Sequence, residues 1–177
     1  VADTPAVPVP RMRVTPPFSN SKATSLTAQF IYNEPDNHLP GSEPTNRHLV
    51  SEFTALTQMG FSGTDYVRFH LINENMGGLG VNSNLIPMTG RMNNPEFLNE
   101  FEEPLKAIFR GDDGQKKPVW YNITLRYWSD DTRWVQSINV RGGKMKVENG
   151  QWVNGRGIRP WVRRNIPKPR RGAVLNI

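Results

Sequence analysis

The sequence contains no cysteine, only three histidines and no acidic residue after Glu148. Without cysteine the chain can form neither a disulfide nor a thiolate metal site, so a bound metal would need His, Asn, Asp, Glu or water. Such ligands suit a hard cation such as Mg²⁺. No apolar run reaches the ~20 residues that cross a bilayer. We therefore expect no membrane span and no thiol chemistry.

The start of the chain also lacks a feature, namely a charged-then-apolar signal pattern. The first residue is Val1 instead of Met. We therefore expect either a processed chain or a domain cut from a longer protein.

Positive charge is concentrated at the end of the chain. The formal net charge is +6 and the pI is about 9.9. Seven cations and no acid follow Glu148, namely Arg156, Arg159, Arg163, Arg164, Lys168, Arg170 and Arg171. This distribution favours a polyanionic partner such as nucleic acid. The alternative is that a basic tail aids solubility or binds an acidic protein.

Length and composition predict one α+β domain with few helices. The 177 residues, 36% of them hydrophobic, can form one core. Residues 1–22 carry five prolines and are predicted to form an extended linker or strap, which leaves 23–177 as the domain. Residues 154–177, with Pro160, Pro167 and Pro169, show no clear period and are predicted to be an irregular basic tail.

Periodicity predicts the elements of the domain. Alternating apolar residues predict strands, and residues spaced by three or four predict helices. Strands are predicted at 25–32, 64–72, 118–128 and 132–153, and helices at 47–60 and 94–109. The last two strand regions, at 118–153, have hairpin turns at 129–131 and 148–150 and predict an antiparallel meander. In the second helix Asn94 is the predicted N-cap, and Pro104 should kink the helix or end its first part.

The predicted strand at 64–72 and the loop after it carry the first candidate site. Val67 and Phe69 point to one face of the strand, and Arg68 and His70 share the other. The following loop, 73–84, has three glycines and four asparagines, a composition that favours tight backbone near a ligand.

Of the three histidines, only His70 has a pattern of candidate partners. His38 and His48 lie in a turn-rich segment and at a helix start, respectively. A histidine beside a bound cation can act as general base on water while the metal stabilises charge on a phosphate. The alternative is a structural histidine on a half-buried strand.

The segment TDYVRFHLINENMGGLGVNSNLIPMTGRMNN resembles the core of the DNA/RNA non-specific endonucleases, the ββα-metal or His-Me finger nucleases. It is most similar to versions that form toxin domains at the C-termini of large bacterial effector proteins. In that family an Asp-Arg-Gly-His strand is followed by Asn-Leu-x-Pro, an asparagine at a helix start, and a glutamate within the helix. The resemblance spans residues 64–153 and implies a ββα-metal finger core at 64–109, followed by the meander at 118–153.

The resemblance implies specific roles for site residues. His70 corresponds to the general base and Arg68 to the arginine before it, while Asn84 begins the Asn-Leu-x-Pro motif. Asn93 falls at the Mg²⁺ ligand, with Asn94 as a close rival because Glu102, which supports the water shell of the metal, lies eight residues after it. On a helical wheel Asn94 faces the apolar side and Glu102 its margin.

The family also implies a function, and two departures from its motif leave an alternative open. The implied function is an Mg²⁺-dependent endonuclease acting on DNA or RNA, exported or delivered into a target cell and restrained by an acidic immunity protein. Val67 and Phe69 replace the Asp and Gly of the motif. The alternative is a catalytically silent nucleic-acid-binding or structural module. Strand alternation places Phe69 opposite His70, where its ring can pack in the core.

The tail supplies a third group of candidates. Trp161 lies among arginines, a mixture that can hold phosphates while an aromatic ring stacks on an unpaired base. The candidate nucleic-acid contacts are Arg156, Arg159, Trp161, Arg163 and Arg164. The alternative is that Trp161 anchors the tail onto the domain. The other tryptophans, in predicted strands, are expected in the core or in cross-strand pairs.

Overall fold

A computed structural model describes residues 7–32, 41–112, 114 and 116–171 and shows an α+β fold, as predicted. The strands are β1 (Arg13–Thr15), β2 (Leu26–Ile31), β3 (Tyr66–His70), β4 (Leu85–Thr89), β5 (Val119–Tyr127), β6 (Val135–Glu148), β7 (Gln151–Gly157) and β8 (Trp161–Arg163). The helices are α1 (Val50–Gln58), η1 (Glu74–Met76), η2 (Asn82–Asn84), η3 (Met92–Glu102) and α2 (Glu103–Arg110). Within these ranges no helix has the length and apolarity to cross a membrane. His38 lies outside the described residues.

Six strands form one antiparallel sheet in the order β1-β2-β5-β6-β7, with β8 paired to the first half of β6. The predicted meander is confirmed. Its second turn, Asn149–Gly150, has positive φ angles of 51° and 76°. Asn-Gly favours this conformation in two-residue hairpins. One face of the sheet is apolar and buried. The residues that alternate with the buried ones along β5 and β6 point outward.

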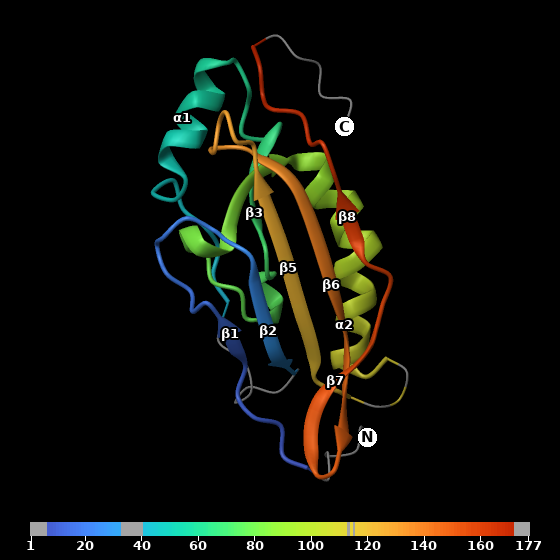
Figure 1. Cartoon of the computed structure of the whole chain (residues 1–177). Coiled ribbons are helices and arrows are strands. Elements are labelled where there is room, and N and C mark those ends of the chain that lie inside the picture. Colours follow the sequence, from blue (N-terminus) through green and yellow to red (C-terminus); the bar gives the residue numbers. More distant parts are fainter. Residues whose placement is uncertain (1–6, 33–40, 113, 115, 172–177) are drawn as a thin grey trace.

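The second structural unit is a hairpin followed by a helix, the ββα arrangement. Strands β3 and β4 pair antiparallel, with Tyr66 opposite Thr89 and His70 opposite Leu85. The helix η3 then packs on this hairpin, since the rings of Phe69 and Phe97 lie 5.0 Å apart. Figure 1 shows the helix η3–α2 lying behind β5 and β6, on one side of the large sheet.

The helix runs through Pro104 without ending there. Glu102 and Glu103 both have α-helical dihedral angles, and η3 is π-helical up to Glu102. The backbone N–H of Glu103 donates to Leu98 O, five residues earlier. The effect expected of Pro104, which lacks an N–H, therefore takes the form of a widened turn before it.

The hydrophobic core lies between the large sheet and the ββα unit. Phe69, Phe97, Phe101 and Tyr121 are each at most 1% exposed. The rings of Phe101 and Tyr121 are 5.7 Å apart in an edge-on arrangement. The hydroxyl of Tyr121 donates to Leu71 O at 2.7 Å, which joins the two units at the end of β3.

Both ends of the described chain are more ordered than the sequence predicted. In the predicted strap, β1 pairs with β2 as an edge strand. The irregular tail was a wrong prediction for residues 154–157 and 161–163, because β7 and β8 both pair with β6. The physical reason is that the long strand β6 leaves backbone groups open to both segments, which local periodicity does not record.

Candidate active site

His70 ends β3 and is held in one orientation by a backbone carbonyl. Its imidazole is half-buried, and Nε2 lies 3.0 Å from Ser42 O. Because a carbonyl only accepts, a neutral His70 donates its proton from Nε2. The unprotonated nitrogen is then Nδ1, which is the atom able to take a proton.

The glycine loop fixes the position of Ser42. Ser42 N donates to Gly78 O at 3.1 Å, and Gly80 N donates to Ser42 Oγ at 2.9 Å. A Cβ on Gly78 would lie 1.7 Å from Ile72 O, and one on Gly41 1.9 Å from Glu74 O. The sequence predicted tight backbone near a ligand in this loop. The close contacts are instead with other backbone segments of the same chain. These glycines are needed to hold the carbonyl that orients His70.

Arg68 shares the face of His70, as predicted, and contacts the segment that begins α1. Its Nε donates to His48 O at 2.8 Å, and its guanidinium lies 3.9 Å above the ring of Phe53. Burial lowers the pKa of Arg68 from its ordinary value. The guanidinium therefore ties β3 to α1.

Asn84, the start of the Asn-Leu-x-Pro motif, is fully buried and closes the loop between β3 and β4. Its Oδ1 accepts from Ile72 N, and its Nδ2 donates to Ile72 O and Leu79 O, each at 2.9 Å. A buried amide with these partners stabilises the loop. Asn84 therefore acts by fixing backbone two residues after His70.

Asn93 and Asn94 lie at the start of the long helix. Asn93 is half-buried, whereas Asn94 is exposed and has extended dihedral angles, φ −145° and ψ 119°. The prediction that Asn94 faces the apolar side was wrong, because its backbone lies outside the helical path. Neither side-chain amide is hydrogen-bonded to another described residue. Their uncommitted oxygens fit the donor set that Mg²⁺ prefers.

Glu102 is more deeply buried than the predicted margin position, at 4% exposure. It accepts from Asn73 Nδ2 at 3.1 Å and lies 3.8 Å from Lys106 Nζ. Burial raises the pKa of Glu102 to about 6, although Lys106 and Asn73 act in the opposite direction. Since Lys106 already supplies a positive charge, Glu102 fits a supporting role better than direct metal ligation. It connects the helix to Asn73, three residues after His70.

The ββα unit carries all of these motifs, but His70 and the helix lie on opposite faces of β3, and no contact joins His70 to Asn93 or Asn94 among the described residues. Phe69 faces η3, and His70 faces Ser42. Asn94 lies three residues before Phe97, whose ring contacts Phe69. In the part of the chain that the structure describes, no three His, Asp or Glu side chains are grouped as metal ligands. A metal here would therefore depend on amide oxygens and water.

The tail residues divide into Trp161 and Arg163, which contact the helix η3, and arginines that are exposed. Trp161 is 2% exposed, packs 4.9 Å from Phe97 and donates from Nε1 to Glu100 Oε2. Arg163 forms ion pairs with Glu96 and Glu100. This packing agrees with the anchor alternative and leaves no open face of Trp161 for a base.

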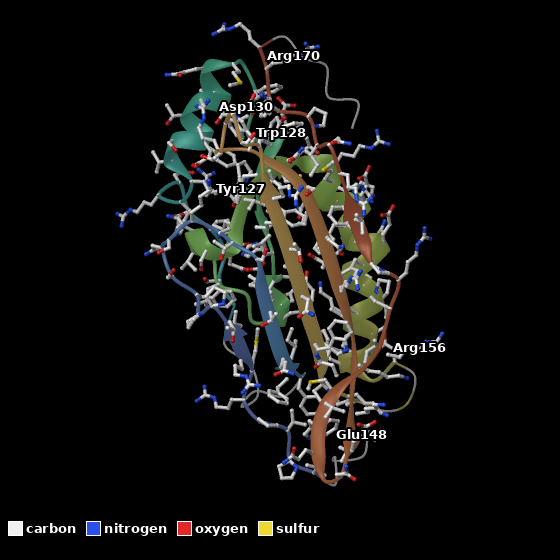
Figure 2. All side chains as sticks on the ribbon, viewed as in Figure 1. Tyr127, Trp128, Asp130, Glu148, Arg156 and Arg170 are labelled. Carbon is white, nitrogen blue, oxygen red and sulfur yellow. The ribbon has the colours of Figure 1, made fainter. Side chains whose placement is uncertain are left out.

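The remaining tail candidates, Arg156, Arg159 and Arg164, are exposed. They form no ion pair with another described residue. Figure 2 shows Arg156 and Arg170 at opposite ends of the molecule. The cations that are adjacent in sequence therefore do not form one patch.

Sequence reasoning missed two residues of this site. Ser42 acts through its carbonyl, for which a sequence carries no signal. Asn73 could have been found, because it is an asparagine three residues after the candidate base. Its Oδ1 accepts from Asn75 N, while its Nδ2 reaches Glu102.

Comparison with known proteins identifies the family. No curated protein and no solved structure matches the chain. A family profile described as DNA/RNA non-specific endonuclease matches residues 36–146, more than half of the chain. The match contains His70, the glycine loop, Asn84, both helix-start asparagines and Glu102. The chain belongs to the DNA/RNA non-specific endonuclease family.

Proposed function

We propose that the protein is a divalent-metal-dependent endonuclease that hydrolyses phosphodiester bonds of DNA or RNA, with His70 as general base. The family supplies the reaction class. The observation that supports the role of His70 is its contact with Ser42 O, which leaves Nδ1 as the nitrogen that accepts a proton. A fixed tautomer removes the need to select an orientation when water is deprotonated.

In this mechanism His70 Nδ1 takes a proton from the attacking water. The oriented ring keeps its Nε2 proton on Ser42 O and becomes imidazolium, and the same carbonyl stabilises that charge. Arg68, on the same face, adds positive charge where the phosphate would lie. Little sequence preference is expected, because the substrate is held through its backbone charge.

We propose Asn93, with Asn94 as second choice, as the protein ligand of a hydrated Mg²⁺. When bound, the cation supplies charge stabilisation for the scissile phosphate. Asn93 would contribute its free amide oxygen, and Glu102 would act through Asn73 and nearby water. Asn93 is half-buried and Asn94 is exposed, so we expect one of the two to dominate.

We further propose that the domain is a toxin, exported or delivered into a target cell and restrained by an acidic immunity protein. The sequence resemblance to effector toxin domains and the net charge of +6 support this role. Co-expression with a candidate acidic neighbour protein should remove toxicity. Toxicity that persists despite complex formation would contradict the restraint.

The reaction class is tested by nicking of supercoiled plasmid at low salt, with Mg²⁺ and with EDTA. Mg²⁺-dependent nicking that weakens steeply with added salt is expected. Absence of nicking, together with retained nucleic-acid binding, would favour the alternative of a silent scaffold. The burial of Phe69 supports an active nuclease over a silent scaffold, because its ring lies in the core and leaves His70 unobstructed.

The metal ligand is tested with Asn93→Ala and Asn94→Ala, each the control for the other. Mn²⁺ affinity is measured by electron paramagnetic resonance in the absence of substrate, so the readout does not depend on activity. One variant should lose about tenfold or more in affinity. Equal Mn²⁺ affinity in both variants and the wild type would show that neither Asn93 nor Asn94 is a metal ligand.

A further inference from the structure

The outer face of the large sheet, turned away from the core and the ββα unit, carries a polar groove. It has a volume of about 420 Å³ and lies across β5, β6 and the end of β8. Figure 1 shows β5 and β6 in front of η3–α2, so this face lies opposite the helix. The side chains that matter here are Thr124, Arg126, Gln136, Ser137, Asn139 and Arg164, and we call this the outer groove.

The charged side chains that line the outer groove are all positive. Arg126 and Arg164 line the outer groove, and no Asp or Glu does. Arg141 continues the same face, because it pairs with Asn122 while Asn139 pairs with Thr124. All three arginines are exposed, and none forms an ion pair with another described residue. Unpaired guanidinium groups on a surface without acids attract anions.

The outer groove also contains an unsatisfied acceptor. Asn139 Oδ1 is buried and has no hydrogen-bond partner among the described residues. Buried polar atoms are nearly always paired in folded proteins, so an unpaired one indicates a missing partner. A carbonyl oxygen needs a donor, which a bare phosphate cannot supply. A hydroxyl or amine next to a phosphate, as in a nucleotide, would satisfy both Asn139 and the arginines.

The types of side chain that line the outer groove favour a nucleic acid over a protein as its partner. None of the side chains that line the outer groove is aromatic. The centres of protein interfaces are rich in aromatic residues, and base stacking also needs them. Arginine together with Ser, Thr, Asn and Gln is the set that contacts phosphates and sugars. The ligand that fits is the sugar-phosphate backbone of a nucleic acid.

We propose that the outer groove is a second nucleic-acid site that holds a strand by its backbone, away from His70. Arg126 and Arg141 lie four register positions apart, about 13 Å along the sheet. That span matches about four nucleotides of one B-form strand. The site rests on the proposed function for its substrate class and would keep the enzyme on a polymer between cuts.

The test is binding of a fluorescent 15-nucleotide single strand, as DNA and as RNA, measured by anisotropy in EDTA so that no cutting occurs. The variant is Arg126→Ala/Arg141→Ala/Arg164→Ala. The control is Arg11→Ala, which removes an exposed arginine without an ion pair in the described chain from outside the outer groove. The triple variant should bind about tenfold or more weakly, and the slope of log affinity against log salt should fall by about 2. The control should change neither.

Asn139→Leu tests the orphan acceptor. Weaker binding of RNA alone assigns the donor to the 2′-hydroxyl and supports a backbone site, whereas equal weakening of RNA and DNA assigns it to a base amine and contradicts binding through the backbone alone. The proposal is overturned if the folded triple variant and Asn139→Leu both bind like the wild type. Equally tight binding of poly-glutamate of matched charge would also overturn it, in favour of an acidic protein.

Plasmid nicking by the same variants separates this proposal from the proposed function. If the wild type cuts while the triple variant binds normally, the outer groove is not a nucleic-acid site, and the proposed nuclease function is supported. If the wild type does not cut while the triple variant binds weakly, the proposed nuclease function is wrong, and the outer groove is supported as a nucleic-acid site.

Discussion

Phe69 stands where the family motif has glycine, and its replacement by glycine should harm the fold without improving catalysis. The side chain is 1% exposed, and its ring lies 5.0 Å from Phe97 and 6.4 Å from Trp161. Truncation of a buried Phe to Ala lowers the free energy of unfolding by about 3–5 kcal/mol. Glycine in a strand adds about 0.5–1 kcal/mol. The expected loss for Phe69→Gly is therefore about 3.5–6 kcal/mol.

Urea unfolding followed by tryptophan fluorescence measures this loss. Phe69→Leu, which keeps most of the volume, is the control and should lose about 1–2 kcal/mol. Because Phe69 faces away from His70, cleavage per folded molecule of the leucine variant should equal that of the wild type. A loss below about 1 kcal/mol for Phe69→Gly, accompanied by faster cleavage, would refute the assignment of this side chain to the core.

Three further predictions follow from buried contacts. Asn84→Ala removes three side-chain hydrogen bonds to Ile72 and Leu79 and should lower the free energy of unfolding by about 3–6 kcal/mol in urea; a loss below about 1 kcal/mol would contradict the closing role. Glu102 has a pKa of about 6 when folded against 4.5 ordinarily, so the unfolded chain loses this proton first and wild-type stability falls as pH rises from 4.5 to 6. Glu102→Gln should therefore gain about 2 kcal/mol relative to the wild type between pH 4.5 and pH 7, and a constant difference would contradict burial of the charge. Arg68→Lys keeps the charge but loses the planar contact with Phe53, which should lower stability by about 1–2 kcal/mol in thermal unfolding; unchanged stability with weaker substrate binding would assign Arg68 to phosphate alone.

Local pattern was sufficient for β2, β3, β5 and β6 and for the two long helices. The alternation in 64–72 correctly separated Phe69 from His70 and Arg68, and the Asn-Gly turn correctly predicted the β6–β7 hairpin. These predictions depend on residues that are neighbours in the chain. The motif also located Asn84, although its function as a loop clamp required the positions of Ile72 and Leu79.

Contacts between distant segments were the part that sequence could not supply. The carbonyl that orients His70 belongs to Ser42, 28 residues earlier. The arginines next to Trp161 in the sequence predicted that its ring stacks on a base. In the structure its neighbours are Phe69 and Phe97. In each case the deciding partner is brought close by the tertiary fold, which leaves no local period or spacing.

Plasmid nicking by His70→Ala tests whether His70 is the general base. The control is His48→Ala, which removes an imidazole bound only to Thr45 among the described residues. With circular dichroism and Mn²⁺ affinity unchanged, His70→Ala should lose at least about a hundredfold in cleavage rate, while His48→Ala retains activity. Wild-type cleavage by a folded, metal-binding His70→Ala variant would contradict the account.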